Sequence, residues 1–422
     1  MASRNSILLE NGIALIHDSN SHVVPKPLDI LIQYGKPSKL EKGICTSNDV
    51  EPQLKGRHAD ELLMEYMVAG LSLVQLAAHA IYGSRLAGML EAIDAGNTTV
   101  VDHAHINVTA EHSKLGIGAT ASSGIRAAFC YAPINIVKGF NPFAFHENPL
   151  EYWIMQTFSD LADVSPVRNG RVSLGFAWDL WSLDPDIARS MFAKVTIKLR
   201  WLDSRFIVSH GGDISKDDKA LLEESGVHVS APQSTELQMS MGRPVCFDAS
   251  FTNTELHILG ARLGLQNAKN HFGQYTMKHG EILKKFPQSL SVEAAFNLAT
   301  IKGVGTAKMP NEIGRIAAGY KSDLAIFDAL NPSMVGAAQH DPVAAIILHS
   351  NPADIETVIV NGILGKSEGK LVGISVDTSA KEAVGRTELG WSEIAKEVVK
   401  SREAVQSETE KVELAENMSQ NL

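Results

Sequence analysis

Two short apolar segments on either side of a helix-length segment most constrain the fold of this chain. Residues 207–209 are β-branched or small and predict a buried strand, and Gly226 precedes a second strand over residues 227–230. Between them, residues 214–224 predict a helix. A strand, a helix and a strand in this order form one unit of a parallel sheet. His210 directly follows the first strand, at the end where parallel barrels carry out their chemistry, although on the local pattern it is equally a loop histidine without a role.

The same alternation of strands and helices occurs in the first half of the chain. Residues 86–95 have helical spacing, and residues 98–102 are a β-branched segment that predicts a buried strand. Strands are expected again at residues 125–130 and 171–177, with a helix over residues 150–161 between them. This order predicts an α/β protein with a parallel barrel of the TIM type.

Both ends of the chain carry short β segments, which predict a small β domain added to the barrel. Residues 6–16 alternate weakly, and Asn11-Gly12 is a hairpin-turn signal. After Pro310, strands are expected at residues 313–316, 323–327 and 357–362. The final segment is rich in charge and is expected to be either a docking helix or partly disordered, with apolar residues at roughly helical spacing: Trp391, Ile394, Val398 and Val405.

Composition narrows the classes of partner and compartment. The chain has 422 residues, a formal net charge of −10 and three cysteines that form no CxxC motif. Such a negative surface repels phosphate backbones, so no nucleic-acid partner is expected. The widely spaced cysteines favour a reducing compartment, which predicts a cytoplasmic location. The apolar run at residues 7–9 is too short for a signal peptide, and the run at residues 68–96 contains too many charges for a membrane span, so no membrane partner is expected.

His103-Ala104-His105, at the end of the strand predicted over residues 98–102, is the strongest candidate for chemistry. Alternate residues of a strand point the same way, so two imidazoles could chelate one metal ion. Alternatively, Asp102 and the two histidines form a hydrogen-bonded polar cluster at the barrel mouth. A metal needs at least one further ligand, for which His210 is the obvious candidate. The next carboxylates of interest are Glu236 and Asp248.

Several segments together resemble the amidohydrolase superfamily, and in particular its chlorohydrolase and cytosine-deaminase-like branch. They are residues 91–105, the segment around His210, residues 313–328 and Val360-Asn361-Gly362. The resemblance implies a metal-dependent (β/α)8 barrel and a small β-sandwich built from both chain ends. It also implies hydrolysis of C–N or C–Cl bonds of a small heterocycle by water bound to Zn²⁺ or Fe²⁺, whose pKa the metal lowers toward about 7.

The resemblance also implies a division of the chain. Residues 1–45 and 310–372 would form the sandwich, residues 46–309 the barrel and residues 373–422 a charged, partly helical tail. The expected partner is a small-molecule substrate, and relatives of this kind are often dimers or larger, so a homo-oligomer is possible.

Three positions depart from the family pattern, each at a strand that should carry a metal ligand. Residues 44–52 lack the His-x-His pair of the first strand, and residues 193–198 lack the histidine of the fifth. Asp248 runs directly into the helix that should follow the aspartate of the eighth strand. His103 and His105 fall at the second strand, and only His210 is in register.

We therefore expect a metal-dependent hydrolase with His210, His103 and His105 as metal ligands and Asp248 as the catalytic carboxylate. The alternative is a non-catalytic relative that keeps the scaffold, or a sequence that omits segments of a working enzyme.

Overall fold

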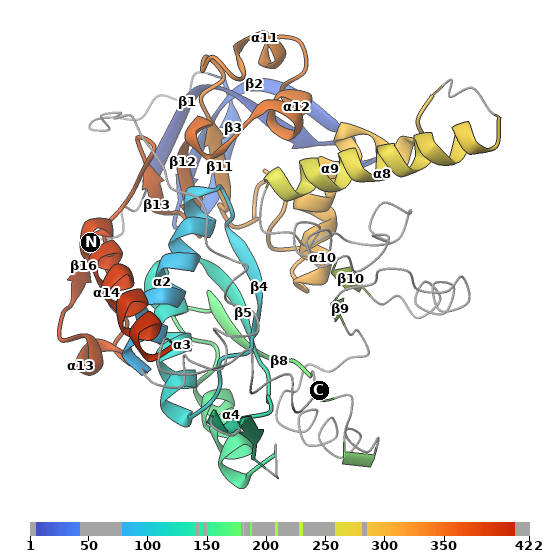
Figure 1. Cartoon of the computed structure of the whole chain (residues 1–422). Coiled ribbons are helices and arrows are strands. Elements are labelled where there is room, and N and C mark those ends of the chain that lie inside the picture. Colours follow the sequence, from blue (N-terminus) through green and yellow to red (C-terminus); the bar gives the residue numbers. More distant parts are fainter. Residues whose placement is uncertain are drawn as a thin grey trace.

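The fold was obtained as a computed structural model. It describes residues 6–42, 78–140, 143–146, 150–178, 180, 186–187, 207–209, 228–230, 258–280 and 285–409. In this part of the chain, helices and sheets alternate in the first half and antiparallel sheets occur at the two ends (Figure 1). The α/β class expected from the sequence is confirmed.

A parallel three-stranded sheet forms the best-described part of the predicted barrel region. Its strands, in the order β4-β5-β8, are Thr99–Ala104, Arg126–Tyr131 and Val172–Phe176. Three helices share one hydrophobic core with the sheet, namely α2 (Ala78–Asp94), α3 (Ala110–Ser123) and α4 (Tyr152–Val164). The predicted strands and the helices around residues 86–95 and 150–161 are confirmed here.

Helix α3 was missed by the sequence analysis because it has no hydrophobic periodicity. Most of its residues are Ala, Gly, Ser or Thr, yet nearly all of them are buried. Its ends carry ordinary helix signals: the Thr109 hydroxyl accepts a hydrogen bond from the backbone N–H of His112, and Gly124 ends the helix at φ 88°. Small residues let the helix lie close to its neighbours, so burial follows from size rather than from an apolar stripe.

The predicted strand–helix–strand unit is confirmed in its strands. Strand β9 (Ile207–Ser209) pairs in parallel with β10 (His228–Ser230). The helix expected between them lies outside the described residues. Parallel pairing of these two strands is the topology expected from the sequence.

Two antiparallel sheets come from the chain ends. The N-terminal sheet contains β1 (Ser6–His17), β2 (Val23–Gln33) and β3 (Lys36–Glu41). The C-terminal sheet contains β11 (Leu324–Phe327), β12 (Ile355–Val360), β13 (Ile363–Ser367) and β14 (Lys370–Leu371). Both sheets contribute to one hydrophobic cluster, made of Ala14, Ile30, Ile32, Leu324 and Ile359.

Two sequence expectations about these ends are wrong. Asn11-Gly12 is a bulge within β1 rather than a hairpin turn, because Asn11 adopts φ 59° and its N–H bonds the Asp29 carboxylate at 2.8 Å. Residues 313–316 form bends and irregular chain instead of a strand. Gly314 there has φ +85°, and a Cβ would lie 2.7 Å from Val304, so the backbone turns tightly against the preceding helix.

The remaining elements connect and cover these sheets. Helix α14 (Trp391–Thr409) packs against α2 (Figure 1), so this part of the charged tail is a docked helix. The others are β6 (Val137–Phe140), β7 (Phe143–Phe145), α8 (Ile258–Lys278), η3 (Gln288–Leu290), α9 (Val292–Asn297), η4 (Leu298–Lys302), α10 (Gly303–Thr306), α11 (Val335–Ala338), α12 (Pro342–Ala344), η5 (Ala345–His349), η6 (Pro352–Asp354), β15 (Ile374–Ser375), α13 (Lys381–Val384) and β16 (Glu388–Leu389). Among the described residues, no helix is both long enough and apolar enough to cross a membrane.

Candidate functional site

The candidate site lies at the carboxyl end of β4, where His103 and His105 come together as the sequence predicts. Their imidazole rings stack with centroids 4.2 Å apart and planes 7° from parallel. In the sheet, His103 is in register with Cys130 of β5, and Cys130 with Gly175 of β8. A Cβ at Gly175 would lie only 2.6 Å from the Cys130 sulfur, so the glycine leaves the space that the thiol fills.

Asp102, which precedes His103 in the chain, has a charged partner on another element. Its carboxylate pairs with Arg85 of helix α2, and both side chains are only 13% exposed. The Arg85 guanidinium also lies over the Phe129 ring, 5.0 Å from its centroid. Successive residues of a strand face opposite sides of the sheet. Asp102 therefore faces helix α2, where Arg85 lies, and His103 faces the opposite side of the sheet.

Arg85 is the single arginine of helix α2, and none of the sequence predictions named it as a site residue. A single arginine in such a helix, next in sequence to a strand with a lone aspartate, is the signal that could have identified the ion pair. The pair tethers α2 to β4, and therefore supports the strand that carries His103.

The Cys130 thiol is neutral and unsuited to act as a nucleophile. Burial, with a smaller contribution from the negative charge of Asp102, raises its pKa to about 12. A thiolate is the reactive form of cysteine, so at neutral pH this side chain fills space beside His103 rather than performing covalent chemistry.

The described residues do not complete a metal site. Among them, no group of three or more His, Cys, Asp or Glu side chains is placed to hold an ion. A ring nitrogen binds a metal close to the plane of its ring, and two rings in parallel, separate planes cannot both do so for one ion. His103 and His105 as they lie therefore do not chelate one metal. The predicted third ligand His210 and the carboxylates Asp248 and Glu236 lie outside the described residues, so the predicted set stays a prediction.

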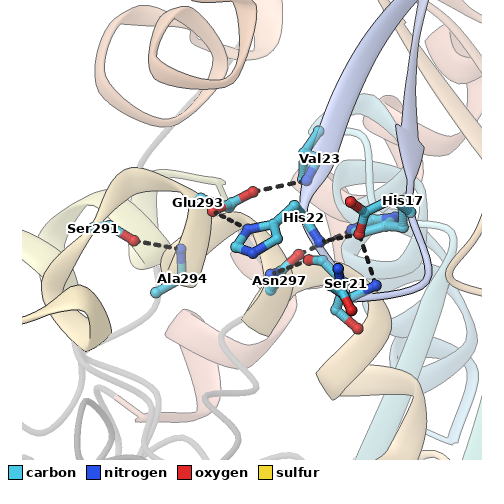
Figure 2. Close-up of polar contacts among 10 residues, drawn as sticks. His17, Ser21, His22, Val23, Ser291, Glu293, Ala294 and Asn297 are labelled. Atoms are coloured by element: carbon cyan, nitrogen blue, oxygen red, sulfur yellow. Dashed lines mark hydrogen bonds and ion pairs between the residues drawn. The ribbon is translucent and has the colours of Figure 1, made fainter.

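A second polar cluster joins the turn between β1 and β2 to helix α9 (Figure 2). Glu293 accepts a hydrogen bond from the backbone N–H of Val23 at 2.7 Å and lies 3.3 Å from His22 Nδ1. Asn297 donates to the Ser21 carbonyl at 3.1 Å, so its Oδ1 faces His17 Nε2 at 2.9 Å. Four side chains thus hold a hairpin of the N-terminal sheet on a helix about 270 residues further along the chain.

Part of the chain matches a known family, and curated deaminases resemble a larger part of it. A profile of the amidohydrolase family matches residues 246–364. A 5-methylthioadenosine/S-adenosylhomocysteine deaminase from Acetivibrio thermocellus is 23% identical over 319 residues, which cover 68% of this chain and 71% of that protein. The resemblance to the amidohydrolase superfamily is confirmed.

Solved amidohydrolase-like structures share the fold of the chain. An adenosine deaminase from Xanthomonas campestris with bound zinc superposes with a TM-score of 0.64 at 14% identity, covering 95% of this chain and 98% of that one. An atrazine chlorohydrolase from Arthrobacter aurescens complexed with zinc gives a TM-score of 0.65 at 16% identity, covering 86% and 96%. At such low identity the likeness establishes the fold alone.

Proposed function

We propose that this amidohydrolase-like chain hydrolyses a C–N bond, other than a peptide bond, of a small heterocycle, with deamination of an aminopurine compound as the first reaction to test. The observation that carries the proposal is the match over 68% of the chain to a deaminase of 5-methylthioadenosine and S-adenosylhomocysteine. Removal of chlorine from a heterocycle is the related reaction, suggested by the chlorohydrolase of similar fold.

The proposed site is the carboxyl end of the parallel strands, with His103, His105 and His210 as ligands of Zn²⁺ or Fe²⁺ and Asp248 as the catalytic carboxylate. A divalent metal, when bound, supplies a water-derived nucleophile near neutral pH. The zinc in the solved neighbours supports a metal of this kind. Because the His103 and His105 rings lie in parallel planes, at least one of them would have to rotate before both could bind one ion.

The wider architecture belongs to the same proposal. Residues 46–309 would form a (β/α)8 barrel, and residues 1–45 and 310–372 a composite β-sandwich. The hydrophobic cluster shared by Ile30, Leu324 and Ile359 supports the sandwich. We further propose a cytoplasmic enzyme with a small-molecule substrate, no nucleic-acid or membrane partner and a homo-oligomeric state.

The test combines metal content with ammonia release from the purified full chain. The expected result is about one equivalent of zinc or iron, and release of ammonia from 5-methylthioadenosine or adenosine that a chelator abolishes. His210→Ala should remove both metal and activity, whereas His340→Ala, at an exposed position, should change neither. Metal that survives His210→Ala contradicts the ligand assignment.

A second candidate is a relative that keeps the scaffold without catalysis. The parallel imidazole planes favour it, as do the three family ligand positions that this sequence lacks. Absence of bound metal after incubation with Zn²⁺ and Fe²⁺, together with absence of ammonia release, would decide for this candidate.

A further inference from the structure

We propose that Asn107 is a positioning residue, which holds the loop after β4 so that the imidazoles of His103 and His105 stack. Asn107 lies two residues beyond His105 and is only 2% exposed. The proposed role of Asn107 concerns the candidate site of the proposed function. It is argued from the hydrogen bonds of the Asn107 amide, so it can be tested whether or not the protein is a catalyst.

The amide nitrogen of Asn107 joins the ends of two neighbouring strands. Its Nδ2 donates to the carbonyl of Ala104, the last residue of β4, at 2.5 Å. It also donates to the carbonyl of Ala132, which directly follows β5, at 3.0 Å. The strand ends are linked directly as well, because Ala132 N–H donates to the Ala104 carbonyl at 3.2 Å. The amide therefore closes the sheet edge immediately after the strand that carries His103.

The other polar groups of Asn107 hold the loop itself. Its backbone N–H donates to the His105 carbonyl at 2.9 Å, which bends the chain tightly at Ile106, directly after His105. Its Oδ1 accepts from the Ser113 hydroxyl of helix α3 at 2.9 Å. The Ser113 hydroxyl can also donate to the Thr109 carbonyl, 3.3 Å away. The orientation of the Asn107 amide is set by its other end, because the Ala104 and Ala132 carbonyls both accept hydrogen bonds and therefore require the NH₂ group on their side.

Asparagine is well suited to this position because it supplies two donors and one acceptor on a short side chain. An aspartate would place a carboxylate oxygen against the Ala104 and Ala132 carbonyls. All three oxygens are hydrogen-bond acceptors, so they would repel one another and stay without a donor in the interior. The loop would then be expected to move away from the β5 end, and the His105 ring with it. The distance between the two rings is thus the quantity that reports on Asn107.

The experiment compares Asn107→Asp with Asn97→Asp. Asn97 is a matched control at the opposite end of β4, where its Nδ2 donates to the Ala92 carbonyl at 3.1 Å. NMR of the full chain with labelled histidine, assigned through His103→Gln and His105→Gln, measures the nuclear Overhauser effect between the two rings. We expect the effect in the wild type and in Asn97→Asp, and its loss, with shifted ring signals, in Asn107→Asp.

Retention of the inter-ring effect in Asn107→Asp overturns the proposal, as does an equal loss in Asn97→Asp, since that would reflect general destabilisation. If Asn107→Asp does not fold, Ser113→Ala replaces it, because this variant removes the hydrogen bond to Asn107 Oδ1, together with the longer contact to the Thr109 carbonyl, and leaves the Asn107 side chain itself unchanged. The expected result is then a shift of both ring signals that Asn97→Asp does not produce, and unchanged signals overturn the proposal.

Titration with Zn²⁺ distinguishes this inference from the proposed function. Zinc binding is measured in the wild type, because the stacked rings of His103 and His105 cannot both bind one ion unless one of them rotates. A wild type that binds no zinc contradicts the metal site, while the inter-ring effect still decides the role of Asn107.

Discussion

Two junctions attach the terminal sheets to the rest of the molecule, and they differ in how deeply their charged side chains are buried. In the buried junction, Arg126 of β5 donates two parallel hydrogen bonds to Asp323, at 2.7 and 2.9 Å, with the side chains only 1% and 2% exposed. In the hairpin junction, His17, His22, Glu293 and Asn297 join β1 and β2 to α9, and the Glu293 side chain is 27% exposed. One junction places a complete ion pair in the interior, and the other leaves titratable groups near water.

The buried junction is closed by backbone as well as by charge. Asp323 also accepts the N–H of Asn361 at 2.7 Å, and Ser322 N–H donates to the Gly35 carbonyl at 2.8 Å. Gly362 approaches so closely that a Cβ there would lie 2.3 Å from the Gly35 Cα. The two terminal sheets therefore meet at glycines, where no side chain separates the backbones. The buried Asp323 carboxylate is tolerated beside them because its hydrogen bonds are satisfied.

The strongest way to break the contrast is Asp323→Asn. This change leaves the Arg126 charge buried without a counter-charge, and loss of one partner of a buried pair destabilises by about 3–5 kcal/mol. Urea unfolding of the full chain measures the effect. The control is Glu312→Gln, at the more exposed pair with Lys321, where a loss of about 0–1 kcal/mol is expected. Similar losses in both variants would show that burial does not distinguish the pairs.

A smaller effect is expected from Glu293→Ala in the hairpin junction. The change leaves the Val23 N–H without its 2.7 Å acceptor and removes the contact to His22. Because the group is partly exposed, water replaces some of the lost bonding, and a destabilisation of about 1 kcal/mol is expected. Glu403→Ala, at an exposed position of α14, is the control and should be close to neutral. A loss as large as that of Asp323→Asn would remove the distinction between the junctions.

The smallest effect is a pH dependence that belongs to the hairpin junction alone. Burial lowers the pKa of His17 in the folded state, and the positive charge of Arg315 lowers it further. The hydrogen bond to Asn297 raises this pKa, and the negative charges of Glu293 and Asp18 raise it more weakly, so the net shift is downward. As the pH falls below about 6.5, the unfolded chain binds a proton at this residue that the folded chain resists. The contribution of His17 to stability is therefore complete above that pH and is lost progressively below it.

Unfolding free energies of the wild type and of His17→Gln, compared at about pH 7.5 and about pH 5.5, test this dependence. The wild type should lose more stability than the variant on acidification. Parallel losses would indicate that His17 titrates normally. Protonation would also place a hydrogen on Nδ1, which is buried without a hydrogen-bond partner among the described residues, so the neutral ring is the form that fits.

Elements with a clear period or a turn signal could be predicted from the sequence. Strand β4 follows helix α2, whose end is signalled by Gly96 just beyond it with φ 86°. The turns at Asn361-Gly362 and Glu368-Gly369 have the positive φ angles that hairpins require. Asn11-Gly12 carries the same dipeptide signal and yet lies in a bulge, because the Asp29 carboxylate across the strand pair binds its N–H. A local dipeptide therefore indicates which backbone angles are favourable. Whether those angles form a hairpin turn or a bulge depends on a hydrogen-bond partner distant in the sequence, here Asp29.

Local sequence patterns are enough to predict the alternation of strands and helices, the β segments at both ends and the position of His103 and His105 at a strand end. These properties depend on neighbours two to four residues away, which the chain order specifies. Only the tertiary structure decided that Asp102 pairs with Arg85, that Asn107 joins two strand ends and that Arg126 meets Asp323. Each of these contacts links elements that are separate in the chain, and each is strong because other residues exclude water from it.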